Sequence, residues 1–207
     1  MITLPRLYAI VDPARFPDTA ALCASVRELI AGGVTLLQYR NKTGNARQML
    51  DQARELKRCV ASGAKLVMND RADLCVAGGF DGVHVGQDDL SPEGARKVIG
   101  PGLWLGVSCH NPGQVAVADQ TSADYIAIGP VFPTSSKANP DPTVGIEGVR
   151  RARALTRKPL VAIGGITRAN ARSVLDAGAD SIAVISDLSG DPRHAAAEFF
   201  RSFSPAS

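Results

Sequence analysis

The sequence lacks the features that mark membrane-spanning and secreted proteins. None of its apolar runs approaches the roughly 20 residues that cross a bilayer. The N-terminus does not show the basic stretch, apolar stretch and cleavage site of a secretory leader. We therefore expect a cytoplasmic protein with no membrane partner.

Cysteine is scarce, and its spacing is uninformative. No two cysteines stand in the C-x-x-C arrangement that is typical of zinc and dithiol sites. The four are Cys23, Cys59, Cys75 and Cys109. We expect small, buried, reduced thiols in a reducing compartment.

A strong excess of one charge sign is also absent. The chain carries 23 Lys and Arg against 20 Asp and Glu, a net charge of +3. A nucleic-acid-binding protein would need a strongly basic face, so we expect no nucleic-acid partner. Hydrophobic residues make up 45% of the chain, which favours one folded domain over residues 1–207 with a disordered tail at 204–207.

What the sequence does contain is a repeat of short apolar runs and longer amphipathic segments. The runs predict strands at 7–11, 35–39, 66–68, 82–85, 104–107, 125–128, 160–163 and 181–185. The longer segments predict helices at 19–31, 46–61, 92–98, 112–118, 146–155, 168–177 and 192–203, and a short one at 71–77. Asp18 or Thr19 can cap the first helix, and Asp191 followed by Pro192 can begin the last.

Apolar strands joined by helices indicate a parallel sheet covered by helices, and eight such units indicate a (β/α)8 TIM barrel of the α/β class. The chain is short for that fold, which typically takes about 250 residues. An open doubly wound sheet is the alternative. It usually has fewer strands, and no G-x-G-x-x-G follows the first strand here.

Basic side chains follow the second predicted strand, where barrel enzymes carry their chemistry. Because side chains alternate along a strand, Gln38, Arg40 and Lys42 share one orientation and Tyr39 takes the other. Arginine and lysine so close together suit an anion such as phosphate. A solvated basic loop would explain them equally well.

Acidic side chains follow the third and fourth predicted strands. Asp70 and Asp89 could reach one magnesium ion, which takes one or two carboxylates together with water and phosphate oxygens. Each could instead cap the helix that follows. We assign Asp73 and Asp88 to that capping class.

Ser108 and His110 follow the fifth predicted strand, and His84 lies in the fourth. Without a G-x-S-x-G nucleophile turn or an orienting acid, covalent catalysis by Ser108 is not indicated. A hydroxyl there could donate to phosphate. We expect His110 to be a loop residue and His84 a satisfied residue of the core or of a pocket wall.

The last three loops favour anion binding. The long loop at 129–145 carries Thr134, Ser135, Ser136 and Lys137, which suit a closing lid over an anion. The seventh strand leads into Gly164 and Gly165 and the eighth ends in Ile185 and Ser186, the places where this barrel class binds phosphate. Glycines needed only for a tight turn are the alternative.

Taken together, these motifs resemble the thiamine phosphate synthase family over nearly the full chain. The segments that carry the resemblance are QYRNK at 38–42, MND at 68–70, HVGQDD at 84–89, GVS at 106–108, GPVFPTSSK at 129–137, AIGGI at 162–166 and VIS at 184–186. The chain departs from the family pattern at Asn41, a position that is often acidic, and at Ser136, where threonine is common. Neither change removes a metal ligand or a basic residue.

The resemblance implies a transferase that releases pyrophosphate, and a role for each site residue. The pyrimidine diphosphate would be bound by Gln38, Tyr39, Arg40, Asn41, Lys42, Asn69, Ser108 and Lys137, of which Arg40, Lys42, Ser108 and Lys137 would be catalytic. Asp70 and Asp89 would hold one Mg²⁺ per subunit. The thiazole phosphate would be bound by Thr134, Ser135, Ser136, Gly165, Ile185 and Ser186.

Three other functions stay open from the sequence. A thiazole tautomerase of similar sequence would not need the metal pair or the basic segment. Another phosphate-binding barrel, such as those of tryptophan biosynthesis, would lack the diphosphate-binding set. A vitamin-precursor binding protein would hold the ligands without turnover. The sequence also leaves a homo-oligomer open.

Overall fold

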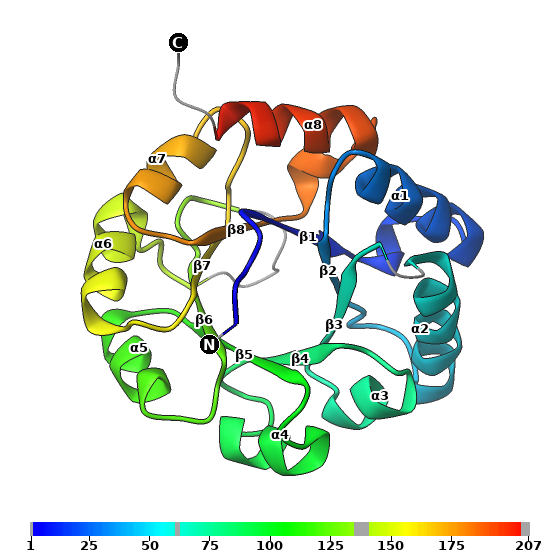
Figure 1. Cartoon of the computed structure of the whole chain (residues 1–207), viewed down its shortest axis with the longest axis horizontal. Coiled ribbons are helices and arrows are strands. Elements are labelled where there is room, and N and C mark those ends of the chain that lie inside the picture. Colours follow the sequence, from blue (N-terminus) through cyan, green and yellow to red (C-terminus); the bar gives the residue numbers. More distant parts are fainter. Residues whose placement is uncertain (1, 61–62, 135–140, 204–207) are drawn as a thin grey trace.

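The computed structural model describes residues 2–60, 63–134 and 141–203. Within them, eight parallel strands close into a barrel in the order β1 to β8, and helices surround it (Figure 1). The strands are β1 (Leu7–Val11), β2 (Leu36–Tyr39), β3 (Lys65–Asn69), β4 (Gly82–Val85), β5 (Trp104–Cys109), β6 (Tyr125–Ile128), β7 (Leu160–Ile163) and β8 (Ser181–Val184). The predicted (β/α)8 barrel is confirmed.

Each strand is followed by a helix that packs on the outside of the ring. The helices are α1 (Thr19–Ala31), α2 (Ala46–Val60), α3 (Ala72–Ala77), α4 (Pro92–Ile99), α5 (Pro112–Asp119), α6 (Gly145–Leu155), α7 (Ala171–Asp176) and α8 (Pro192–Ser202), with 3-10 turns η1 (Pro13–Arg15) and η2 (Ser186–Leu188). The Asp18 side chain caps α1, and that of Asp191 caps α8 with Pro192 in its first turn, as predicted. No helix in the described ranges has the length and apolar character to cross a membrane.

Strand alternation divides the core into two parts. In β1, Leu7 and Ala9 face the helices and belong to the larger apolar cluster, while Tyr8 and Ile10 point into the barrel. The interior cluster also includes Leu4 from the N-terminal segment, which crosses the middle of the ring in Figure 1. Burial on both faces explains why the strands read as continuous apolar runs.

Two boundaries differ from the sequence prediction in a way that bears on the site. Strand β5 runs on to Cys109, because Ser108 pairs with Ala127 of β6, so Ser108 lies within the strand and not after it. Helix α7 begins at Ala171 and not at 168, because Asn170 turns its side-chain oxygen back to the Thr167 amide. The four cysteines are free thiols, as expected, but only Cys23, Cys75 and Cys109 are buried, and Cys59 is half-buried.

Three aspartates tie neighbouring strands together at the amino ends of the strands. Asp81, Asp124 and Asp180 stand just before β4, β6 and β8, and each accepts a hydrogen bond from the first or second amide of the preceding strand at 2.7 to 2.9 Å. Each carboxylate also pairs with a basic side chain from a helix. These buttresses fix the strand register on the side away from the strands' carboxyl ends.

Replacing Asp124 by alanine should destabilise the fold. The change removes the acceptor of the Leu105 amide and leaves the largely buried Arg96 without its carboxylate, 2.7 Å away in the native protein. We expect the free energy of unfolding to fall by about 2–4 kcal/mol. Urea denaturation measures it.

The matched control is Asp176→Ala, which removes an exposed pair with Arg172 on one helix. That change should cost no more than about 0.5 kcal/mol. Equal costs for the two variants would show that the Asp124 buttress is not a special contributor to stability.

Candidate active site

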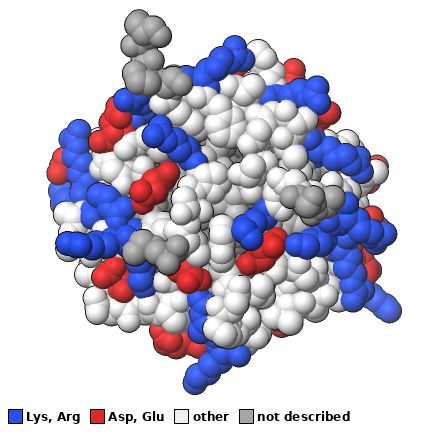
Figure 2. Space-filling model, in the orientation of Figure 1, with Lys and Arg blue, Asp and Glu red and all other residues white. Residues whose placement is uncertain are grey.

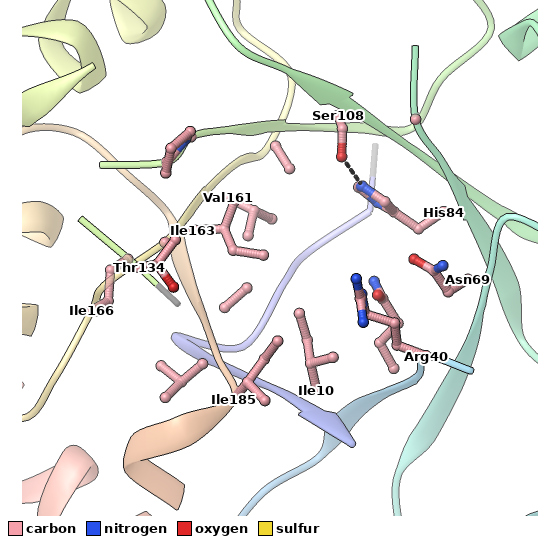
Figure 3. A pocket seen from close by; sticks show the side chains of 18 of the residues that line it. Ile10, Arg40, Asn69, His84, Ser108, Thr134, Val161, Ile163, Ile166 and Ile185 are labelled. Atoms are coloured by element: carbon pink, nitrogen blue, oxygen red, sulfur yellow. Dashed lines mark hydrogen bonds between the residues drawn. The ribbon is translucent and has the colours of Figure 1, made fainter. Parts of the chain in front are cut away.

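A cavity of about 830 Å³ opens at the carboxyl ends of the strands. Its two sides differ in character. Figure 3 shows Arg40, Asn69 and His84 on one side, facing Val161 and Ile163 across the cavity. The cavity can therefore hold a ligand that is polar at one end and has a flat apolar surface at the other.

Most of the predicted site residues meet in this one cavity. Those that line it are Gln38, Arg40, Lys42, Asn69, Asp70, Asp89, Ser108, Thr134, Gly165, Ile185 and Ser186. Ser135, Ser136 and Lys137 lie outside the described residues. Only Tyr39 and Asn41 are described and do not line it.

The side chains of Tyr39 and Asn41 lie behind the basic segment. The Tyr39 hydroxyl donates to Gln52 of α2 at 2.6 Å, and the Asn41 amide nitrogen donates to both of these groups. The Asn41 oxygen accepts from the amides of Thr43 and Gly44. These bonds shape the loop after β2, so a direct side-chain contact from either residue to a ligand in the cavity is not supported.

The two basic side chains of this segment are each balanced by a carboxylate. Arg40 donates to Asp12 at 3.0 Å from the end of β1, and Lys42 pairs with Asp70 at the end of β3. All four groups are at least partly sheltered from solvent except Lys42, which is about half exposed. Lys42 is more exposed than Arg40, so it can turn more easily towards an incoming anion.

Asp70 has an uncommon backbone conformation. Its φ of 62° is the only positive value at a non-glycine residue in the described ranges, and such a conformation costs of order 1 kcal/mol. Helix α3 receives no side-chain cap, and the side-chain cap of α4 is Ser91. Helix capping is therefore the wrong explanation for both Asp70 and Asp89.

The pKa of Asp70 reflects the charges around it. Burial raises the pKa of Asp70, the Lys42 ammonium opposes that shift, and the neighbouring Asp89 adds to it. Asp89 is held by an amide hydrogen bond from Gly86 at 2.7 Å. Two carboxylates held close against their repulsion fit a divalent cation. No group of three or more metal-binding side chains occurs in the described part of the chain.

The other two acidic residues of these loops are not helix caps. Asp73 lies inside the first turn of α3, which has no side-chain cap, and pairs with Arg71 at the surface, so its assignment as a cap is wrong. Asp88 lines the cavity, so its assignment as a helix cap is wrong.

The inner part of the cavity contains a chain of five hydrogen-bonded side chains. Gln38 Nε2 donates to the Tyr8 hydroxyl at 3.0 Å, and Tyr8 and Tyr125 share a bond of 3.1 Å. His84 lies 3.1 Å from Tyr125 through Nδ1 and 2.8 Å from Ser108 through Nε2, the bond drawn in Figure 3. His84 is therefore a satisfied pocket-wall residue, as expected.

Burial sets the protonation of this chain. It lowers the pKa of His84 to about 4, with Asp89 opposing the shift, so the imidazole is neutral near pH 7. Burial likewise raises the pKa values of Tyr8 and Tyr125 well above the ordinary value, so both phenols stay protonated. Neither tyrosine was singled out from the sequence as a site residue. Their signal was alternation, because each falls on an inward position of an otherwise apolar strand.

Asn69 carries a polar atom with no partner. Its Nδ2 is buried and makes no hydrogen bond within the described residues, although the residue lines the cavity. Buried donors without partners are rare in folded proteins, so such an atom is a candidate contact for a ligand.

His110 ties two loops together at the rim. Its Nδ1 lies 2.8 Å from the Gly129 carbonyl and 3.5 Å from Asp141, and its amide donates to Gln114 of α5. It is a loop residue, as expected, and it also lines the cavity.

Two glycines after β7 let the loops close in on the other end of the cavity. Gly164 and Gly165 have φ values of 100° and 62°. A Cβ on Gly165 would stand 2.5 Å from the Pro133 carbonyl oxygen and 2.8 Å from Phe132. Across from them, Ser186 begins the turn η2, and its hydroxyl accepts from Arg15 at 3.2 Å.

Charge is mixed on the face drawn in Figure 2. Basic and acidic side chains alternate around its rim, and its centre is mostly uncharged. This face, on which the N-terminus lies in Figure 1, shows no broad basic surface.

Comparison with known proteins gives a consistent result. The profile of a family described as "Thiamine monophosphate synthase" matches residues 7–188. The "Thiamine-phosphate synthase" of Koribacter versatilis is 62% identical over 203 residues, covering 97% of this chain and 96% of the relative. That of Chloroflexus aurantiacus is 43% identical over 182 residues, covering 87% and 83%. The solved "Thiamine phosphate pyrophosphorylase from Pyrococcus furiosus" matches with a TM-score of 0.85 at 35% identity, covering 96% and 95%.

Gly165→Ala should disturb the loop that packs on it. The new methyl group meets left-handed backbone strain and a clash with residues 132–133. We expect the free energy of unfolding to fall by about 2–4 kcal/mol, and inorganic phosphate to bind more weakly in calorimetric titration.

Gly79→Ala separates the two costs. Gly79 has a similar φ of 67°, but nothing lies within 4 Å of a Cβ built on it. The free energy of unfolding of Gly79→Ala should fall by only about 1 kcal/mol, the cost of the backbone conformation, and phosphate binding should be unchanged. If the two variants behaved alike in urea and in titration, close packing at Gly165 would not matter.

Proposed function

The chain belongs to the thiamine monophosphate synthase family, and from that premise we propose that it joins an aminopyrimidine diphosphate to a thiazole phosphate, giving thiamine phosphate and pyrophosphate. As a member of this family it is a transferase. The observation that carries the proposal is the meeting of Arg40, Lys42 and the Asp70–Asp89 pair in the same cavity as Gly165 and Ser186.

The basic and acidic side of the cavity suits the diphosphate. Arg40 offers two parallel donors and Lys42 a compact charge, and both can exchange a carboxylate partner for phosphate oxygens. Gln38, Asn69 and Ser108 would bind the pyrimidine ring, with the unpaired Asn69 Nδ2 as one donor. Tyr39 and Asn41 would act by shaping the loop.

Asp70 and Asp89 are the residues that would hold Mg²⁺, one ion per subunit. When bound, the ion supplies positive charge against the diphosphate as negative charge builds up on it. Two carboxylates leave coordination positions for phosphate oxygens and water.

The glycine side of the cavity suits the thiazole phosphate. Gly165, Ile185, Ser186 and Thr134 line it, and Arg15 lies within hydrogen-bonding distance of Ser186. Roles for Ser135, Ser136 and Lys137 rest on the family resemblance. Apolar side chains such as Val161 and Ile163 give the flat thiazole ring a surface to pack on.

The reaction needs charge stabilisation more than proton transfer. The C–O bond between the pyrimidine methylene and the diphosphate breaks, and its electron pair leaves with pyrophosphate. The thiazole nitrogen then donates its lone pair to the methylene carbon. Arg40 and Lys42 stabilise the leaving group, and exclusion of water protects the cation-like carbon.

The direct test is to mix the purified protein with both substrates and Mg²⁺. Pyrophosphate should appear in equal amount to thiamine phosphate, and chelation by EDTA should stop both. Rearrangement of the thiazole without coupling would favour the tautomerase, and binding without turnover would favour a precursor-binding protein. Either result would overturn the proposal.

The metal assignment makes a separate prediction. Asp70→Asn and Asp89→Asn should each lower turnover by roughly 100-fold and raise the Mg²⁺ concentration needed for half-maximal rate. Asp73→Asn, which changes an exposed carboxylate paired with Arg71, should leave both quantities unchanged. Wild-type turnover in both site variants would refute the assignment of the metal to Asp70 and Asp89.

A further inference from the structure

In the five-residue chain that begins at Gln38 and ends at Ser108, the donor and the acceptor of each hydrogen bond can be assigned. Gln38 Nε2 can only donate, so the Tyr8 oxygen accepts and the Tyr8 proton must go elsewhere. The other partner of that hydroxyl in the described structure is Tyr125. Tyr8 therefore donates to Tyr125, and Tyr125 donates onward to His84 Nδ1.

The direction continues through the imidazole. A neutral histidine that accepts at Nδ1 carries its proton on Nε2, so His84 donates to Ser108 Oγ. Ser108 then has its own proton left to give. The chain thus ends in a free hydroxyl donor at Ser108, while at its start Gln38 Oε1 accepts no hydrogen bond from the described residues.

The opposite direction requires Gln38 to rotate its amide. If Tyr125 donated to Tyr8, the buried Tyr8 proton would face an amide nitrogen that is itself a donor, and a buried donor would be left unpaired. Only a rotated amide, with its oxygen on Tyr8, would accept that proton. The orientation of Gln38 and the donor state of Ser108 are therefore coupled.

The fold has room for this chain because one strand position lacks a side chain. A Cβ on Gly106 of β5 would lie 2.1 Å from Tyr125 Cζ and 2.4 Å from His84 Nδ1. Tyr8 and His84 are only 1% and 7% exposed, so water does not compete readily for these bonds.

We propose that Tyr8 and Tyr125 are positioning residues that fix the hydrogen-bond polarity of the cavity, so that it presents an acceptor at Gln38 and a donor at Ser108. The complementary ligand donates from an exocyclic amine at Gln38 and accepts through a ring nitrogen at Ser108. An oxo analogue carries a carbonyl in place of the amine and cannot donate to Gln38 Oε1. This inference rests on the proposed function, and it adds that the tyrosines select the amino form of the pyrimidine.

The first measurement needs no substrate. Nitrogen-15 NMR of the ligand-free protein at neutral pH should show His84 protonated on Nε2, with its signals assigned by comparison with His84→Asn. Tyr125→Phe removes the proton donor to Nδ1 and should give a mixture of tautomers. Tyr8→Phe should keep the native tautomer, because Tyr125 can still donate to His84.

The second measurement is the ratio of kcat/KM for the amino substrate to that for its oxo analogue. Both phenylalanine variants should lower this ratio by roughly tenfold, the effect of losing one well-placed hydrogen bond. The KM for the thiazole phosphate should stay unchanged. The control is Ser181→Ala, which removes a buried hydroxyl with no partner in the described structure at the opposite end of β8, and it should leave the ratio unchanged.

Different results would refute the synthase assignment and the inference about hydrogen-bond polarity. A wild-type protein that releases no pyrophosphate would refute the synthase assignment, whatever the tautomer. A wild-type His84 protonated on Nδ1, or an undiminished ratio in Tyr125→Phe with normal stability, would overturn the polarity inference while leaving the synthase assignment intact.

Discussion

Closure of the eight-stranded parallel sheet is the constraint on which the rest of the structure depends. It brings the carboxyl ends of all eight strands to one rim, so residues far apart in sequence share a single cavity. It also directs alternate side chains inward, where few can be accommodated. The polar residues among them are consequently in contact with one another, as Tyr8 of β1 and Tyr125 of β6 are although these strands are not neighbours in the sheet.

The basic side chains of the cavity are paired with carboxylates. Arg40 rests on Asp12 and Lys42 on Asp70, so neither cation is left isolated in a sheltered site. The unusual backbone of Asp70 holds its carboxylate near Asp89. Under the proposed function, an incoming diphosphate and cation would rearrange existing pairs, which requires less desolvation than burying new charges.

Much of the fold and part of the site could be predicted from sequence. The alternation of apolar runs and amphipathic segments predicted every strand and every α-helix, because both periodicities are local properties. Arg40, Asp70 and Ser186 were found because charged or polar residues at strand ends are unexpected in an apolar context. Alternation also predicted that Tyr39 points away from Gln38 and Arg40, but its partner Gln52 could not be predicted, because only the folded chain brings the two together.

What escaped prediction depends on contacts between distant strands. Tyr8 and Tyr125 look like ordinary strand residues until the ring closes and joins them through Gln38 and His84. Gly106 likewise reads as a strand glycine until the space it leaves is seen to be filled by two side chains. These residues are far apart in the sequence, so no local pattern indicates that they are in contact.

The aspartate buttresses before β4, β6 and β8 show that stability and chemistry depend on different ends of the barrel. They lie at the amino ends of the strands, whereas the cavity lies at the carboxyl ends. Thermal robustness can thus be adjusted at one end of the molecule while chemistry diversifies at the other. Natural variation in the loops around the cavity need not compromise the scaffold, and an engineer could strengthen the scaffold without touching the catalytic end.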